Sequence, residues 1–106
     1  MPLILVDGQI EQAGRLNIGN FEHIVATSTT ITISNSFVRL TSPSMQNVDT
    51  ILGGNQGDVL ILFGNNVGLR RRNNGNLELR SNTLLNNNRS TMLVCVGPFW
   101  VQPGGN

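Results

Sequence analysis

The chain has no lysine or tyrosine and few charged residues of any kind. Of its 106 residues, 12% are charged, and the formal net charge is +1. A balance this close to neutrality argues against nucleic acid or an anionic membrane as the main partner. All seven basic residues are arginine. Its planar guanidinium suits partly desolvated protein contacts, whereas the lysine ammonium is strongly hydrated.

Residues for catalysis and metal binding are equally scarce. The single Cys95 excludes an intramolecular disulfide, and the single His23 excludes a histidine-rich metal site. The turn Gly53–Asp58 offers one carboxylate, too few oxygens for calcium. No nucleophile elbow or phosphate-binding glycine loop is present. We therefore expect that the protein is not an enzyme and binds no metal or cofactor. Glycan cleavage would need two carboxylates that the fold brings together from distant parts of the chain.

The length predicts one domain, for which oligomerisation would be a natural source of extra stability. The N-terminal apolar run, Leu3-Ile4-Leu5-Val6, is too short for a membrane span or the core of a signal peptide. We expect residues 1–8 to form an extended arm, 9–102 a β domain and 103–106 a flexible tail. Leu3, Ile4, Leu5 and Val6 are candidate contacts with a neighbouring chain.

Short β-type runs separated by Gly- and Asn-rich turns dominate the chain. The predicted strands are 3–6, 15–18, 22–26, 29–33, 36–41, 46–52, 58–63, 67–71, 76–80, 83–85, 90–96 and 99–102. Gly97-Pro98 predicts a closing hairpin. Many short strands at this spacing favour an all-β fold, a small antiparallel β-sandwich, jelly roll or barrel.

Two predicted strands, Val59–Phe63 and Met92–Val96, are apolar on both faces, unlike an antiparallel strand with one face in water. Either they are central strands between two packed layers, or one face meets another subunit. The second alternative predicts a homotrimer. The candidate residues for core or trimer interface are Leu60, Ile61, Leu62, Leu93, Cys95 and Trp100.

Two polar clusters are candidates for contacts. Arg70-Arg71-Arg72 precedes an Asn-Gly turn and is either a solvated strand end or a docking site for partner carboxylates. Nucleic-acid binding is less favoured, because no aromatic residues that could stack on bases lie between the arginines. Asn86-Asn87-Asn88 is by default a long turn, because Asn tolerates the left-handed conformation. Two other roles for these asparagines are open. The same Asn from three copies could form hydrogen bonds around a trimer axis, or the amides could bind a glycan together with Trp100.

One stretch carries a family resemblance. Thr30–Ile33 and Phe37–Leu40 precede Ile51-Leu52-Gly53-Gly54-Asn55-Gln56-Gly57-Asp58-Val59-Leu60-Ile61-Leu62, and the chain closes with Thr91–Val96 and a hairpin containing Trp100. This order resembles a β-module of bacteriophage fibres, spikes and capsid decoration (cement) proteins, over roughly 70% of the chain.

The resemblance implies a trimeric structural protein of the virion. Because the chain is short, a cement protein is favoured over a fibre tip. Such a protein would lie on the outer capsid surface, bind the major capsid protein of the shell and stabilise it. The alternative is a tail fibre or spike domain that recognises a host surface glycan.

Overall fold

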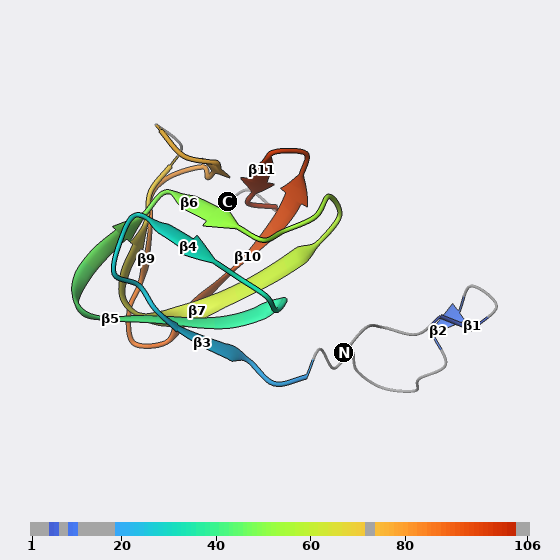
Figure 1. Ribbon diagram of the computed structural model, residues 1–106, viewed down its shortest axis with the longest axis horizontal. Coiled ribbons are helices and arrows are strands. Elements are labelled where there is room, and N and C mark those ends of the chain that lie inside the picture. The colour runs from blue at the N-terminus through green and yellow to red at the C-terminus, as the bar shows by residue number, and fades with distance from the viewer. Residues whose placement is uncertain (1–4, 7–8, 11–18, 72–73, 104–106) are drawn as a thin grey trace.

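The described part of the chain consists of strands and turns, without a helix (Figure 1). The structure, a computed structural model, describes residues 5–6, 9–10, 19–71 and 74–103. The all-β prediction is confirmed. The strands are β1 (Leu5–Val6), β2 (Gln9–Ile10), β3 (Glu22–Val25), β4 (Thr30–Thr32), β5 (Phe37–Val48), β6 (Thr50–Leu52), β7 (Val59–Leu69), β8 (Leu77–Glu78), β9 (Thr83–Leu85), β10 (Arg89–Val96) and β11 (Phe99–Val101).

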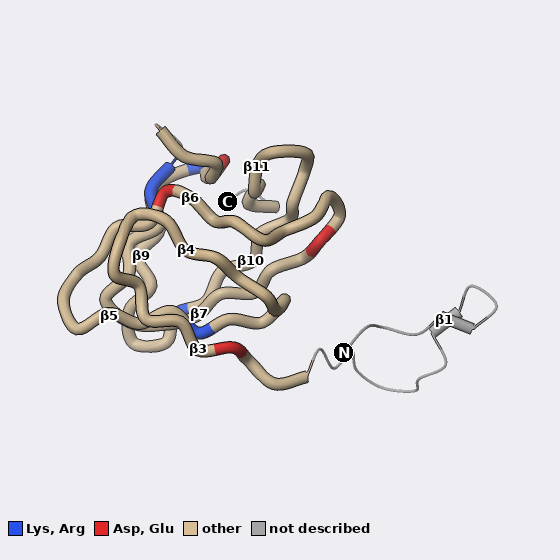
Figure 2. The backbone as a smooth tube through the Cα atoms, viewed as in Figure 1, with Lys and Arg blue, Asp and Glu red and all other residues tan. Residues whose placement is uncertain are grey.

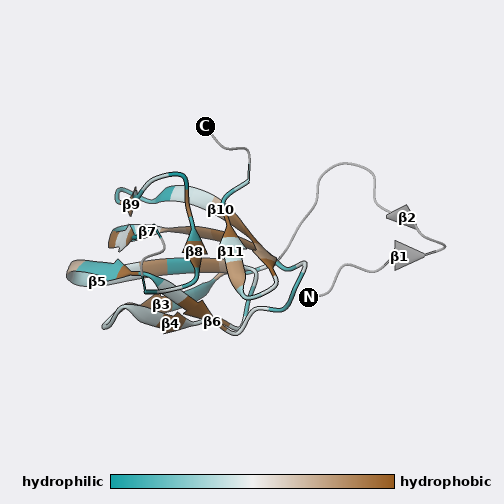
Figure 3. Ribbon diagram, turned by 90° about the horizontal axis from the view of Figure 1, so that it is seen from above, coloured by the Kyte–Doolittle hydropathy of each residue, from teal (hydrophilic) through white to brown (hydrophobic). Residues whose placement is uncertain are grey.

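The first half of the body winds in successive coils, so that strands of the same direction stack beside one another. β3, β5 and β7 are neighbours in one sheet and run parallel, and β4 pairs parallel with β6 in a second sheet. Leu40 of β5 lies between Ile24 of β3 and Gly64 of β7. Figure 3 shows β3, β5, β7 and β10 following one another from bottom to top, in the order in which they pair. The arrangement is that of a short solenoid, in which each coil packs on the next.

The prediction of an antiparallel sandwich, jelly roll or barrel is therefore confirmed only in its all-β class, because the main sheet combines parallel and antiparallel pairs. The segment Gly53–Gly57 does not close a hairpin but carries the chain from β6 in one sheet to β7 in the other. In the described residues, antiparallel pairing is restricted to β1–β2, β7–β9, β7–β10 and β10–β11, while β8 pairs parallel with β11. Turn composition alone does not distinguish a hairpin from a coil corner.

The side chains that point into the solenoid form one apolar core. Leu40, Leu60, Leu62 and Leu93 are completely buried. The other buried members are Ala26, Ile31, Ile33, Val38, Val48, Ile51, Val67, Leu69, Leu77, Leu79, Leu85, Cys95 and Trp100. Among the described residues no polar or charged residue is buried. The core is therefore held by hydrophobic burial.

Asparagines form a corner at which the main sheet bends. Asn66 has φ of 60° and interrupts the pairing of β7 with β5, so that four β5 residues between Thr41 and Gln46 lie opposite it. On the other side of β7, Asn87 and Asn88 also have positive φ. The Asn65 amide donates to Asn88 Oδ1 at 3.2 Å. The predicted turn at Gly64–Asn66 is thus a bend inside one strand, while Asn86–Asn88 is a turn, as predicted.

The chain returns antiparallel to β7 through β9 and β10, and Gly97 turns it into β11. The predicted Gly97-Pro98 hairpin is confirmed, with Cys95 opposite Trp100. The Trp100 ring nitrogen donates to the carbonyl of Ile51 at 3.2 Å. Its backbone N–H donates to the carbonyl of Asn76 at 2.8 Å. Trp100 therefore joins the last hairpin to both sheets.

The predicted N-terminal arm lies mostly outside the described residues, as do the predicted strand 15–18 and residues 104–106 of the predicted tail. Within the arm, the backbone of Leu5–Val6 is described, and it pairs antiparallel with Gln9–Ile10. Contact of residues 1–8 with a neighbouring chain stays a prediction.

Candidate assembly surface and polar pocket

The face of the main sheet that points away from the core is apolar over two neighbouring strands. We call it the outer face; it comprises Val59, Ile61 and Phe63 of β7 and Met92, Val94 and Val96 of β10. These side chains alternate with the buried Leu60, Leu62, Leu93 and Cys95. Ile61 lies opposite Met92, and Val59 opposite Val94, so the six side chains form one continuous patch.

Three phenylalanines extend the outer face towards the start of the solenoid. The ring of Phe63 is 5.3 Å from the rings of Phe21 and Phe37, measured between centroids, and the Phe21 and Phe37 rings are 5.9 Å apart. Phe37 lies opposite Ile61 in the sheet. Phe21 makes edge-to-face contacts with the other two rings, an arrangement that aromatic pairs favour, and the Phe37 and Phe63 rings are tilted by 40°.

The structure buries one face of the two doubly apolar strands in the core and leaves the other face partly exposed. Leu60, Leu62, Leu93, Cys95 and Trp100 are core residues, whereas Ile61 is half-buried on the outer face. That face keeps large exposed fractions: 43% for Val59, 45% for Met92 and 53% for Val96. Contiguous exposed apolar surface on a soluble protein marks an interaction site. The outer face is therefore the candidate assembly surface.

The arginine cluster begins where β7 ends. Arg70 and Arg71 are exposed, and Arg72 lies outside the described residues. The Arg70 N–H donates to the carbonyl of Val48, and the Arg71 N–H donates to Asn82 Oδ1 at 2.7 Å. These backbone bonds fix the strand end and leave both side chains in solvent. Figure 2 shows how sparse charge is over the remainder of the body.

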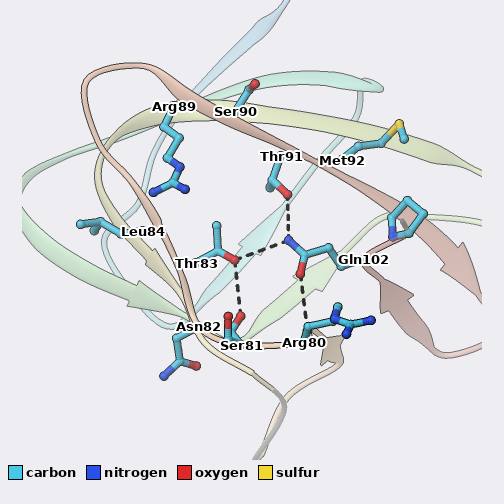
Figure 4. Close-up of a pocket in the computed structure, with 11 residues that line it drawn as sticks. Arg80, Ser81, Asn82, Thr83, Leu84, Arg89, Ser90, Thr91, Met92 and Gln102 are labelled. Atoms are coloured by element: carbon cyan, nitrogen blue, oxygen red, sulfur yellow. Dashed lines mark hydrogen bonds between the residues drawn. The ribbon is translucent and has the colours of Figure 1, made fainter. Parts of the chain in front are cut away.

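A polar pocket of about 480 Å³ lies between the segment Arg80–Leu84 and β10, closed on one side by Gln102 and Pro103 (Figure 4). The Gln102 side-chain amide donates to Thr91 Oγ1 at 3.0 Å and to Thr83 Oγ1 at 3.5 Å. Its oxygen accepts from the Arg80 N–H at 3.4 Å. Gln102 thus ties three distant segments into one wall. Sequence reasoning missed this pocket because only the topology brings the segments together.

The remaining candidate residues have structural contacts. Cys95 is buried, and this burial raises the pKa of its thiol, with a smaller contribution from the charge of Asp58. The Asp58 carboxylate accepts from the Asn55 N–H at 2.8 Å and closes the turn before β7. His23 Nε2 lies 2.8 Å from Thr41 Oγ1. The Glu22 carboxylate accepts hydrogen bonds from the N–H groups of Ser34 and Asn35. These bonds lower the pKa of the carboxyl, and the bond from Ser34 has the largest effect.

Comparison with known proteins adds no relative. No protein family, curated protein or solved structure matches the chain. Within residues 5–6, 9–10, 19–71 and 74–103, no three His, Cys, Asp or Glu side chains gather where they could hold a metal ion. The same residues include no helix long and apolar enough to cross a membrane.

Proposed function

We propose that this chain is a structural protein of a virus particle: a capsid decoration, or cement, protein that binds the assembled phage shell as a homotrimer. The observation that carries the proposal is the outer face on β7 and β10. A solvent-exposed apolar patch on a rigid solenoid is suited to burial against other protein. We assign the outer face to contacts between the three copies, and the arginine cluster to contacts with the shell.

This assignment follows from the chemistry of the two surfaces. Permanent homo-oligomer interfaces are more apolar than the rest of a protein surface, which fits Val59, Ile61 and Met92. Arginines suit a second, polar contact, because the guanidinium pairs with carboxylates in a forked geometry. A protein that binds only the assembled shell stabilises that shell by mass action. The viral setting itself rests on the sequence resemblance.

Attachment and copy number test the proposal. The purified protein, mixed with undecorated phage shells and sedimented, should bind until all sites are filled. Mass spectrometry of intact native particles should count hundreds of copies per particle, as the decoration role implies. Tens of copies, located on the tail, would support the fibre alternative instead, and absence from purified particles would refute both.

The arginine cluster should matter for attachment and not for folding. Replacing Arg70, Arg71 and Arg72 together by Gln should shift the thermal midpoint by only a few degrees, because exposed charges contribute little to stability. Binding to shells should weaken, and wild-type attachment should weaken as salt is raised. Co-sedimentation at several salt concentrations measures both effects. A triple variant that saturates the shell with wild-type affinity would rule out this docking site.

The N-terminal residues should contribute to association. Deleting residues 1–7 removes the apolar run Leu3–Val6, which is suited to adding a strand to a neighbour's sheet edge. We expect weaker trimer or shell association with an unchanged β-type circular dichroism spectrum. Light scattering and co-sedimentation of the truncated protein measure this, and unchanged association in both would remove the arm from the account.

The second candidate function is recognition of a host glycan by a fibre or spike module. The polar pocket beside β10 is the observation that favours it. Its hydroxyl, amide and guanidinium groups are the kinds that hydrogen-bond sugars. Catalysis on a glycan has no support in the pocket, because none of the residues that line it is a carboxylate.

A further inference from the structure

The polar pocket combines positive charge with a rigid hydrogen-bonding wall. Arg80 and Arg89 line it, and both residues are exposed, so their guanidinium groups are accessible to a ligand. In Figure 4 the two lie on opposite sides of the Thr83–Gln102 contact. With two arginines and no acidic residue in the lining, the pocket carries a local charge excess in a chain that is nearly neutral overall.

The wall between the arginines is already ordered before any ligand binds. Gln102 bonds to Thr91, Thr83 and the backbone of Arg80, and its own N–H donates to the carbonyl of Glu78 at 3.2 Å. Thr91 accepts from Gln102 and retains its hydroxyl proton for a further bond. A wall held in this way loses little conformational entropy on binding, which favours affinity.

The size and the lining of the pocket favour an acidic sugar over a small inorganic anion such as phosphate. A volume of about 480 Å³ falls within the range of small-molecule sites and is far larger than a phosphate ion needs. Leu84 and Pro103 add apolar surface beside the polar groups. A sugar ring has C–H faces for such surface and hydroxyls for Thr91 and Asn82. Its carboxylate is the group that a guanidinium binds through two parallel hydrogen bonds.

We propose that this pocket binds an acidic saccharide, a sugar that carries a carboxylate, with the guanidinium groups of Arg80 and Arg89 as the carboxylate ligands. The inference deepens the second candidate function and does not depend on shell binding. Thr83, Thr91 and Gln102 form the fixed wall against which the ring lies.

Titration of the isolated full-length protein tests this proposal. Separate titrations with N-acetylneuraminic acid and glucuronic acid, followed by ¹⁵N–¹H NMR, should shift the amide signals of Thr83, Arg89 and Thr91 saturably. Glucose, which lacks the carboxylate, should bind much more weakly. Arg89→Gln should weaken binding of the acidic sugar by about tenfold or more, as expected for loss of hydrogen bonds to a charged group. Arg80→Gln should weaken binding as well.

Controls separate this site from general charge attraction. Arg39→Gln removes the same charge from β5, outside the pocket lining, and should leave sugar binding unchanged. The NMR spectrum of each variant reports whether it is folded. Inorganic phosphate should bind more weakly than the acidic sugars. The proposal is overturned if neither acidic sugar gives saturable shifts, if Arg89→Gln binds like wild type, or if phosphate binds as tightly. None of these failures would affect shell attachment, which is measured on particles.

Discussion

Replacing Ile61 by Asp should convert the trimer into a folded monomer, whereas replacing Leu93 by Asp should unfold the chain. Ile61 lies on the outer face, and its new carboxylate would remain in water in the monomer but would be buried without a partner in the trimer. Leu93 is completely buried, so an aspartate there introduces an unpaired charge into the core. That cost is several kcal/mol, comparable to the roughly 5–15 kcal/mol of a typical domain.

Light scattering and circular dichroism distinguish the two results. Ile61→Asp should give the mass of one chain with a wild-type β spectrum, and Leu93→Asp should give a loss of that spectrum or insoluble protein. Thr32→Asp is the matched control, because Thr32 is an exposed strand residue in the other sheet. This control should remain trimeric. An Ile61→Asp protein that is still trimeric would show that the outer face is not the assembly surface.

Gly64→Ala should destabilise the fold nearly as much as Leu93→Asp, although it adds only one methyl group. Gly64 lies opposite Leu40 in the parallel β5–β7 pair, and a Cβ at Gly64 would overlap the backbone carbonyl of Leu40. Backbone cannot move aside as a flexible side chain can, so the coils would have to separate. We expect a loss of about 3 kcal/mol or more in the free energy of unfolding, hence a fall of roughly 12 °C or more in Tm.

Gly57→Ala provides the comparison for this prediction. Gly57 has φ of +91°, but a Cβ there would meet no atom within 4 Å. Its substitution should cost only the backbone strain of a left-handed conformation, about 1–2 kcal/mol. Denaturant unfolding of the two variants measures the difference. Equal stability losses would contradict the close contact between the coils at Gly64.

Some strand positions could be predicted from sequence because they depend on local composition. The runs Val59–Phe63 and Met92–Val96 and the turn at Gly97-Pro98 all identified real elements. Other boundaries were wrong: the predicted strand 46–52 covers the end of β5 and all of β6, and the predicted strands 58–63 and 67–71 both overlap β7. Strand direction could not be predicted, because Gly53–Gly57 has the composition of a hairpin turn and yet connects two sheets. Asn66 similarly gave a turn signal, since positive φ serves a bend within a strand as well as a reversal.

The outer face and the polar pocket also differ in how much of each could be predicted from sequence. The sequence predicted that the strands Val59–Phe63 and Met92–Val96 are apolar on both faces, but it did not predict which side chains lie outside. Of the six residues proposed for core or interface, only Ile61 lies on the outer face. Ile61 could not be assigned to core or interface until the register was known. The polar pocket depends on contacts between Arg80, Thr91 and Gln102, which are distant in the chain, and no spacing in the sequence links them.

The mass of the wild-type protein in solution tests the central claim most directly. Light scattering during gel filtration at micromolar concentration should give about 34.5 kDa, three times the chain mass of 11.5 kDa. The exposed apolar patch of Val59, Met92 and Val96 would then be covered by sister copies. A mass of 11.5 kDa at every concentration examined would contradict trimer assembly through the outer face.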